Sequence, residues 1–552
     1  MDHSERYHAL IRQYLEHVWR TDPVGASRQG VHTYGGELGS FTRERVLEEA
    51  RSSVRFLRQF EALDGDALEG DDWADYPFVL KTLQLSARYP TMDRSGPASG
   101  PFIGSPQAQP QFFLDKINDG LFSLIMDDHL SPRHRLELLI RRLEGVESFL
   151  DEARRTLNPK DTPDVFVEQA RLALRGTLDM LRTGVLPMGP SDGTLGVQLG
   201  KALIKAGGAL VRFDRFLKSF GAKACGTFSI GPEKFDYVLQ AYHGLDLDHH
   251  ALLDFGHDEV AYYQGQMAQV AQSMGHGYDW EAAVDAVKVD HPDAPDLRRA
   301  YQREIDRTLS FFRDEGLVSV PAEASATTKW TPRFMWRTAH LGQPWHPPMF
   351  GPATRVRLFV TPVDPNADPD EQEAHLKDNS FAWIRCIVPH EIAPGHYMQY
   401  LVIKQQQTDF RKVFGSRFTS EGWAMYWEEY LREIGYLDTP ALHLMQLRNA
   451  LWRAVRIVVD VGLHTREFDP EEAAEYLVET ARLEPRLARA QVQNYLADPT
   501  GPSGYLGGKR MVKALKRELR RVRRPYRERH FHDDFLALGT LPVPLIRRAL
   551  LR

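Results

Sequence analysis

The sequence predicts a mainly α-helical protein, a large helical body that carries one small β element around residues 354–362. Apolar residues recur at three- and four-residue spacing along most of the 552 residues, as they do in helices with one buried face. The segment TRVRLFVTPVD (354–364), by contrast, alternates in the manner of a strand. Hydrophobic residues make up 42% of the chain, which is enough for a large buried core.

The N-terminal part of the chain is expected to be helical from about residue 5 to residue 185. Segments 44–63 and 133–157 both place their apolar residues on one helical face. Between them, residues 88–110 are rich in proline, glycine and serine, and they predict a long loop that a compact fold must tie down or use. Further helices, broken at short glycine-containing turns, are expected over residues 190–275.

The C-terminal part opens with an aromatic and proline-rich segment at 330–350, which leads into the predicted strand. A buried helical run is expected over residues 380–407, and the helical pattern is strong again over 419–491. A Gly/Pro-rich loop at 497–508 then leads into a basic helix at 509–524.

Composition excludes several classes of partner. The formal net charge is −6, which gives no reason to expect nucleic acid or an anionic membrane as a partner. The two distant cysteines, Cys225 and Cys386, do not make a disulfide framework, so a reducing compartment is expected. The N-terminus has no apolar segment of signal-peptide type, and no run of about 18 apolar residues occurs. These observations predict a cytoplasmic protein.

The motif that carries most information is His390-Glu391-Ile-Ala-Pro394-Gly395-His396. In an ordinary HExxH helix the histidines lie four residues apart and reach one Zn²⁺, while the glutamate serves as general base. Here the spacing is six, which in a regular helix would aim the two imidazoles roughly 120° apart. Pro394 must break the helix, and Gly395 tolerates the backbone angles that return His396 to the metal.

A third metal ligand is expected from the helix that follows. That helix is predicted to open at Thr419 or Ser420, which places Glu421 in its first turn. A carboxylate from a following helix is the usual third zinc ligand in this class of site. Glu428 lies two turns further along the same face and could orient a ligand. The alternative is that Glu421 only complements the helix dipole.

Together, several blocks of the chain resemble the DUF885 family. They are HExxPGH at 390–396, EGWAMYWE at 421–428, RIVVDVGLH at 456–464, DPVGASRQGVHTYGGEL at 22–38 and FHDDFLALGTLPVPL at 531–545. The resemblance runs nearly end to end. It implies a zinc-peptidase-like protein whose architecture is related to the helical oligopeptidases and carboxypeptidases, with a deep central cleft.

Arg456, Asp460 and His464 fall on one face of an otherwise apolar helix. In one interpretation this face lines the cleft, where Arg456 binds a substrate carboxylate and His464 donates a hydrogen bond to the oxyanion. In the other, Arg456 and Asp460 form a structural ion pair and His464 lies at the helix end. The resemblance favours placement in the cleft but assigns no individual roles.

Tyr505, in the Gly/Pro-rich loop, is the candidate donor to the oxygen that becomes negative when water adds to a carbonyl. It also matches a tyrosine in the corresponding block of the family, although a packed loop aromatic is the alternative. The chain departs from the family pattern at Asn494-Tyr495, at Gly501 and at Tyr397. These departures put substrate preference in doubt more than metal binding.

Three further features were weighed against structural explanations. His530 and His532 could reach the cleft or could be structural. The basic segment 509–530 could bind RNA, but Leu515, Leu519 and Val522 make it an amphipathic helix with a solvated cationic face. A second cluster is better explained as a solvated helix start with Asp248 as N-cap; it comprises His243, Asp246, Asp248, His249, His250 and His257.

These predictions lead to one functional hypothesis and two alternatives. We expect a scaffold half at residues 1–320 and a catalytic half at 321–552 within one continuous body. Zn²⁺ held by His390, His396 and Glu421, with Glu391 as general base, would hydrolyse amide bonds of short peptides. The alternatives are a metal-dependent amidohydrolase that tailors a specialised metabolite and a non-catalytic peptide-binding protein. The natural substrate, the cleavage position and the oligomeric state stay open.

Overall fold

The computed structural model describes residues 3–88, 106–189, 193–336, 342–406, 408–465 and 467–552, and the backbone of two short strands between residues 89 and 105. The chain is mainly α-helical, as predicted, and the β structure is small. Apart from those two strands, the predicted loop at 88–110 lies largely outside the described residues up to position 105.

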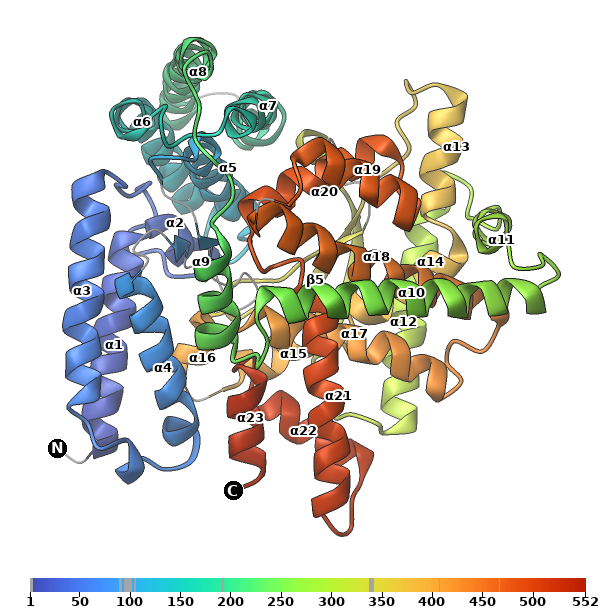
Figure 1. Cartoon of the computed structure of the whole chain (residues 1–552). Coiled ribbons are helices and arrows are strands. Elements are labelled where there is room, and N and C mark those ends of the chain that lie inside the picture. The colour runs from blue at the N-terminus through green and yellow to red at the C-terminus, as the bar shows by residue number, and fades with distance from the viewer. Residues whose placement is uncertain are drawn as a thin grey trace.

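The first half of the chain supplies helices to different parts of the molecule (Figure 1). One group stands apart at the top of the view and comprises α5 (Pro110–Met126), α6 (Pro132–Thr156), α7 (Asp164–Met180) and α8 (Thr194–Gly221). The other helices of this half are α1 (His3–Thr21), α2 (Pro23–Arg28), α3 (Arg43–Glu61), α4 (Gly70–Arg88), α9 (Pro232–Tyr237), α10 (His249–Ser273), α11 (Trp280–Lys288) and α12 (Leu297–Glu315).

The second half carries the sheet and the helices of the C-terminal region. Its helices are α13 (Pro369–Asp378), α14 (Phe381–Glu391), α15 (His396–Lys404), α16 (Asp409–Val413), α17 (Arg417–Glu433), α18 (Pro440–Thr465), α19 (Pro470–Ala481), α20 (Pro485–Ala497), α21 (Gly504–Val522), α22 (Glu528–Ala537) and α23 (Val543–Leu550). Short 3₁₀ or π turns are η1 (Gly65–Ala67), η2 (Leu181–Val185), η3 (Leu186–Met188), η4 (Val238–His243) and η5 (Arg333–Met335).

The predicted strand is the centre of a three-stranded sheet. This strand, β5 (Val356–Val360), pairs in parallel with β3 (Ala326–Trp330), with Ala326 opposite Val356. On its other side β5 pairs antiparallel with β4 (Gln343–Trp345), with Pro344 opposite Leu358. The remaining strands, β1 (Met92–Asp93) and β2 (Phe102–Ile103), form an antiparallel ladder of their own.

Local sequence signals fix many of the helix starts. Asp248 caps α10 by accepting the backbone N–H of Ala251 at 2.8 Å, which confirms its expected role. Asp469 and Glu472 form a reciprocal capping box at the start of α19, with proline at the first helical position. No helix in the described part of the chain is both long and apolar enough to cross a bilayer.

Buried apolar side chains form two clusters. The smaller belongs mainly to α5–α8 and also takes in Phe359 of the sheet. The larger runs through the rest of the molecule, from Tyr7 to Ile546, and includes side chains from both sides of residue 320. The division into a scaffold half and a catalytic half therefore stays a prediction about roles, within a core that is shared.

Candidate functional site

The helical run 380–407 is broken where the sequence predicted. Helix α14 ends at Glu391, and α15 begins at His396 after four residues outside the helical conformation. The backbone of Gly395, with φ −75° and ψ −134°, lies outside the common α and β regions, in agreement with the role expected for it. Glycine is also needed for space, because a Cβ there would lie under 3.0 Å from the carbonyl oxygen of His390.

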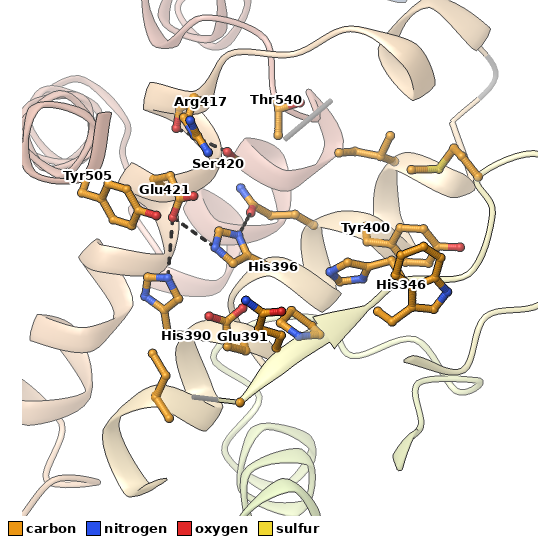
Figure 2. A pocket seen from close by; sticks show the side chains of 18 of the residues that line it. His346, His390, Glu391, His396, Tyr400, Arg417, Ser420, Glu421, Tyr505 and Thr540 are labelled. Carbon is orange, nitrogen blue, oxygen red and sulfur yellow. Dashed lines mark hydrogen bonds and ion pairs between the residues drawn. The ribbon is translucent and has the colours of Figure 1, made fainter. Parts of the chain in front are cut away.

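This break brings the two histidines together beside Glu421 (Figure 2). The His390 and His396 rings lie 4.9 Å apart at 87° to each other. Oε2 of Glu421 lies 3.6 Å from Nε2 of His390 and 3.2 Å from Nε2 of His396. All three possible ligand atoms fall within 4.8 Å of one another, a spacing at which one cation can be shared.

Glu421 comes from α17, which begins earlier than the sequence suggested. The helix starts at Arg417, so Glu421 lies in its second turn and not in its first. Its side chain turns toward the two histidines instead of the end of its own helix. Interaction with the helix dipole, the alternative considered for Glu421, therefore does not account for its position.

A second carboxylate holds His390 from behind. Oε1 of Glu428 lies 2.6 Å from Nδ1 of His390, and the Glu428 side chain is fully buried. A ring that gives its Nδ1–H to a carboxylate keeps the Nε2 lone pair free for a metal. Burial alone would lower the pKa of His390, but the carboxylates of Glu421 and Glu428 outweigh it and raise that pKa to about 10.

The atoms of this cluster fit a divalent cation. Oε2 of Glu421 is buried and has no hydrogen-bond donor among the described residues, although it faces two imidazole nitrogens. Two histidines and one carboxylate are a donor set that zinc favours, and it leaves a fourth position open. In the described part of the chain, no other group of three His, Cys, Asp or Glu side chains has metal-binding geometry, and the cluster around His249 is not one.

The cluster forms part of the wall of a cavity of about 630 Å³. Glu391 also lines this cavity, next to His390 in the sequence and beside the two imidazoles in space (Figure 2). Burial raises the pKa of Glu391, and the two histidines oppose that effect without cancelling it. A carboxyl group so placed can exchange a proton with a molecule bound in the cavity.

Tyr505 lies on the same cavity but in a different setting from the one expected. It belongs to the first turn of α21, which begins at Gly504, and so it stands on a helix instead of a flexible loop. Its ring lies 6.5 Å from that of His390, and Figure 2 shows its hydroxyl directed toward Glu421. Burial, reinforced by Glu421, raises the pKa of Tyr505 to about 12, so its hydroxyl keeps its proton and can donate it to a hydrogen bond.

The polar face of α18 divides into two parts. Arg456 lines the cavity, whereas Asp460 and His464 do not. Asp460 accepts hydrogen bonds from the backbone N–H groups of Thr500 and Ser503, at 3.1 and 3.2 Å, and so holds the segment before α21. Nε2–H of His464 donates to the carbonyl of Tyr495 at 3.0 Å. Neither the proposed Arg456–Asp460 pair nor a path from His464 to the cavity is present.

The remaining candidates have structural positions. His532 is buried between the carbonyl of Leu317, 2.7 Å from Nδ1, and the hydroxyl of Tyr426, 2.8 Å from Nε2. In helix α21, Leu515 and Leu519 are buried as expected, but Val522 is exposed at the last residue of the helix. The apolar stripe of the basic helix is therefore one residue shorter than predicted.

Arg453 and His346 are cavity residues that were not identified from the sequence. Arg453 also lines the cavity, and its spacing of three from Arg456 on an apolar helix was a signal that could have found it. His346 stacks 5.0 Å from Tyr400 and has no hydrogen-bond partner on Nδ1 among the described residues. Its segment is aromatic and proline-rich without periodicity, so no sequence pattern singles it out.

Comparison with known proteins supports the family and the fold. The sequence profile of a family described as bacterial protein of unknown function (DUF885) matches residues 23–550. A structure described as a "putative lipoprotein of unknown function from Shewanella oneidensis" is similar with a TM-score of 0.80 and 18% identity, over 99% of this chain and 100% of that one. A "putative lipoprotein from Colwellia psychrerythraea" gives 0.81 and 17%, over 100% and 99%. A comparison with curated proteins found no match.

These neighbours contradict the cytoplasmic location expected from the sequence, because both are described as lipoproteins. The expectation rested on the two distant cysteines, on an N-terminus without an apolar segment of signal-peptide type and on the absence of a long apolar run. A lipoprotein is held at a membrane by its acyl chains, so it needs no spanning helix. The cytoplasmic location is therefore withdrawn.

Proposed function

Because the chain belongs to the DUF885 family of bacterial proteins of unknown function, we propose an activity from its own site: zinc-dependent hydrolysis of amide bonds in short peptides. The observation that carries the proposal is the convergence of His390, His396 and Glu421 on one point of a cavity wall. Glu391 lies beside that point, and it is the group that a hydrolase needs and a simple metal store does not.

The roles follow from the donor set and the cavity. Zinc held by His390, His396 and Glu421 would supply Lewis acidity, which lowers the pKa of a water to about 7 and polarises an amide carbonyl. Glu391 accepts the proton of the attacking water and passes it to the leaving nitrogen. Tyr505 donates a hydrogen bond to the carbonyl oxygen as that atom gains negative charge. Water thus adds across the amide C–N bond, giving one carboxylic acid and one amine.

The shape of the site favours small substrates. A cavity of about 630 Å³ is of the size that encloses a ligand of a few residues. Its wall combines segments far apart in the sequence, from Gly25 near the N-terminus to Thr540 near the C-terminus. A folded protein domain could not enter such a space, whereas an extended peptide of a few residues could.

Metal analysis combined with digestion of a mixed peptide library tests the proposal. We expect the purified chain to hold one zinc and to cleave short peptides, as followed by mass spectrometry. Glu391→Gln should keep its zinc but lose at least 10²-fold in turnover, because its amide cannot accept the proton. Glu421→Ala should lose the metal, because two imidazoles alone bind zinc weakly.

Glu433→Gln is the matched control, because it removes an exposed carboxylate from the last turn of the same helix α17. It should keep both metal and turnover. Wild-type rates in Glu391→Gln, or unchanged zinc content in Glu421→Ala, would refute the assignment. Metal without peptide cleavage would instead support an amidohydrolase with another substrate. Absence of both metal and cleavage would support a peptide-binding protein.

A further inference from the structure

Two guanidinium groups face the cavity from helix α18. Arg453 and Arg456 are 4% and 8% exposed, and both line the same space as the candidate metal ligands. They are three residues apart, so they lie on one face of the helix, one turn from each other. Tyr505 lies close to both, within 5.8 Å of Arg453 and 4.7 Å of Arg456, measured from each guanidinium carbon to the ring centroid.

Neither guanidinium forms a direct ion pair with a carboxylate among the described residues, although the charges of Glu428 and Glu421 act on them at longer range. Arg453 donates to the carbonyl of Asn449 at 3.2 Å, and Arg456 makes a long contact of 3.5 Å with Oε1 of Gln491. The Nε atoms of both arginines are buried without an acceptor in the described structure. A buried guanidinium whose N–H groups contact no carboxylate is incompletely satisfied, so such a group points to a ligand that brings one.

The other cations of the cavity wall behave differently. Arg28 pairs with Asp119 at 2.9 Å, and Lys412 pairs with Asp409 at 3.0 Å. Arg417 forms an ion pair with Asp498. Of the lysine and arginine side chains on the described wall, only Arg453 and Arg456 therefore lack a direct ion-pair partner.

The aromatic side chains around them preserve this arrangement. The guanidinium carbon of Arg456 lies 4.4 Å from the Trp452 ring centroid, and that of Arg453 lies 5.2 Å from it. Stacking on a ring holds a guanidinium by its face and leaves the N–H groups at its edge free. Those N–H groups are arranged to bind the two oxygens of a carboxylate at once.

The charge balance of the site leads to the same ligand class. Three carboxylates, from Glu391, Glu421 and Glu428, lie at the candidate metal centre, and together with the two arginines they leave one negative charge in excess. A divalent cation at the centre would turn this into one positive charge in excess. One carboxylate brought by the substrate would restore neutrality.

The distance between the arginines and the metal centre favours the carboxylate at the end of a peptide over one on a side chain. The Tyr505 ring bridges the two features, since its centroid lies 6.5 Å from that of His390 and 4.7 Å from the guanidinium carbon of Arg456. An extended chain advances about 3.3–3.6 Å per residue. The two separations together set an upper limit of about 11 Å between the His390 ring and Arg456, which one to three residues beyond the cleaved bond can span.

We propose that Arg453 and Arg456 bind the free C-terminal carboxylate of the substrate, so that the site removes one to three residues from the C-terminal end of short peptides. This inference rests on the proposed peptidase function and specifies its substrate. The hydrolysis is the one given above: water adds, the C–N bond breaks, and no other reactant is required.

Three matched probes test the inference: acetyl-Ala-Ala-Phe as the free acid, the same peptide as its C-terminal amide, and acetyl-Ala-Ala-Glu amide. We expect the wild-type zinc enzyme to hydrolyse the free acid with a kcat/KM about 30- to 1000-fold above that of either amide, the range for losing one partner of a buried charge pair. Arg456→Gln should lower kcat/KM for the acid toward that of the amides, so that the ratio of the acid rate to the Phe amide rate falls at least tenfold.

Arg489→Gln is the matched control, because it removes an exposed guanidinium from α20 that pairs with Glu471 outside the cavity. It should leave the preference for the free acid unchanged. Arg456→Lys keeps the charge without the planar fork, and an intermediate loss is expected from it. If Arg456→Gln does not fold, the inference is tested by the ratio of the acid and amide rates, measured for the wild type and for Arg456→Lys.

Three results would overturn the inference: equal rates for acid and amide, cleavage of the Glu amide as fast as the free acid, or removal of residues from the N-terminal end. Binding to zinc-loaded Glu391→Gln, measured by calorimetry with the same probes, separates this failure from failure of the proposed function. Tighter binding of the acid than of the amides without any turnover in the wild type would refute the peptidase and support the carboxylate site. Equal binding would refute the carboxylate site.

Discussion

At the scale of single residues, Glu428 acts on the metal centre without facing the cavity. Its Oε1 accepts the Nδ1–H of His390 at 2.6 Å, in an environment where the carboxylate is fully buried. We predict that Glu428→Gln weakens zinc binding by about 10- to 100-fold, because the amide is a poorer acceptor and no longer fixes the imidazole tautomer. Competition with a fluorescent chelator measures the dissociation constant directly.

Glu433→Gln serves again as the control, since it changes an exposed glutamate of the same helix. The melting temperature of Glu428→Gln should stay close to that of the wild type, because the substitution keeps the volume of the side chain. Zinc affinity equal to the wild type in a folded Glu428→Gln would show that this hydrogen bond does not support the metal centre.

Residue identities at the site were accessible from sequence where a local signal decided them. The two histidines follow from the proline–glycine break between them, and Glu428, two turns from Glu421, follows from helical periodicity. The absence of a direct ion pair at Arg453 could not be predicted in this way, because it depends on which carboxylates of other helices lie close to it. His464 was placed in the cleft for the same reason: its helix face was known, but the neighbour covering that face was not.

At the scale of elements, the contact between α17 and α21 determines how Glu421 and Tyr505 face each other. The two helices touch through glycine: a Cβ on Gly508 would lie under 3.0 Å from the Phe418 carbonyl oxygen and from Cα of Gly422. We predict that Gly508→Ala pushes the helices apart, lowers the melting temperature by several degrees and reduces peptide turnover at least tenfold. Thermal unfolding and kinetic assays measure the two effects.

Gly176→Ala provides the comparison, because Gly176 lies in helix α7 with open space around its Cβ position. Alanine there should keep or raise the melting temperature, because alanine favours the helical conformation over glycine by up to about 1 kcal/mol. If Gly508→Ala unfolded at the wild-type temperature and kept full turnover, close packing of these two helices would not be what positions the site.

The ends of the helices show which features local sequence signals predict and which depend on tertiary contacts. The break before His396 was predicted because proline and glycine act within their own segment. The start of α17 at Arg417 and the helical setting of Tyr505 were not predicted. In both cases the local signal favours a cap or a loop, and tertiary contacts extend the helix: Asp460 holds the segment before α21, and Arg417 is paired with Asp498.

At the scale of the whole molecule, the candidate metal centre lies within a core that does not depend on it. The larger apolar cluster runs through helices from both ends of the chain, and the α5–α8 group has a cluster of its own. Small zinc domains unfold without their metal because they lack such cores. A chain of 552 residues with this much buried apolar surface is expected to stay folded when the metal is removed.

Metal removal should therefore lower stability without abolishing the fold. Zinc that binds only the folded state stabilises it by about 2.7 kcal/mol at a free concentration 100 times its dissociation constant, and by about 4.1 kcal/mol at 1000 times. We predict that a chelator lowers the melting temperature of the wild type by a few degrees while the far-ultraviolet circular dichroism keeps its helical signal. Glu421→Ala should melt at one temperature with and without chelator, because it has no metal to lose. An unfolded metal-free chain would show that the cation, and not the shared apolar core, holds the helices of the C-terminal half together.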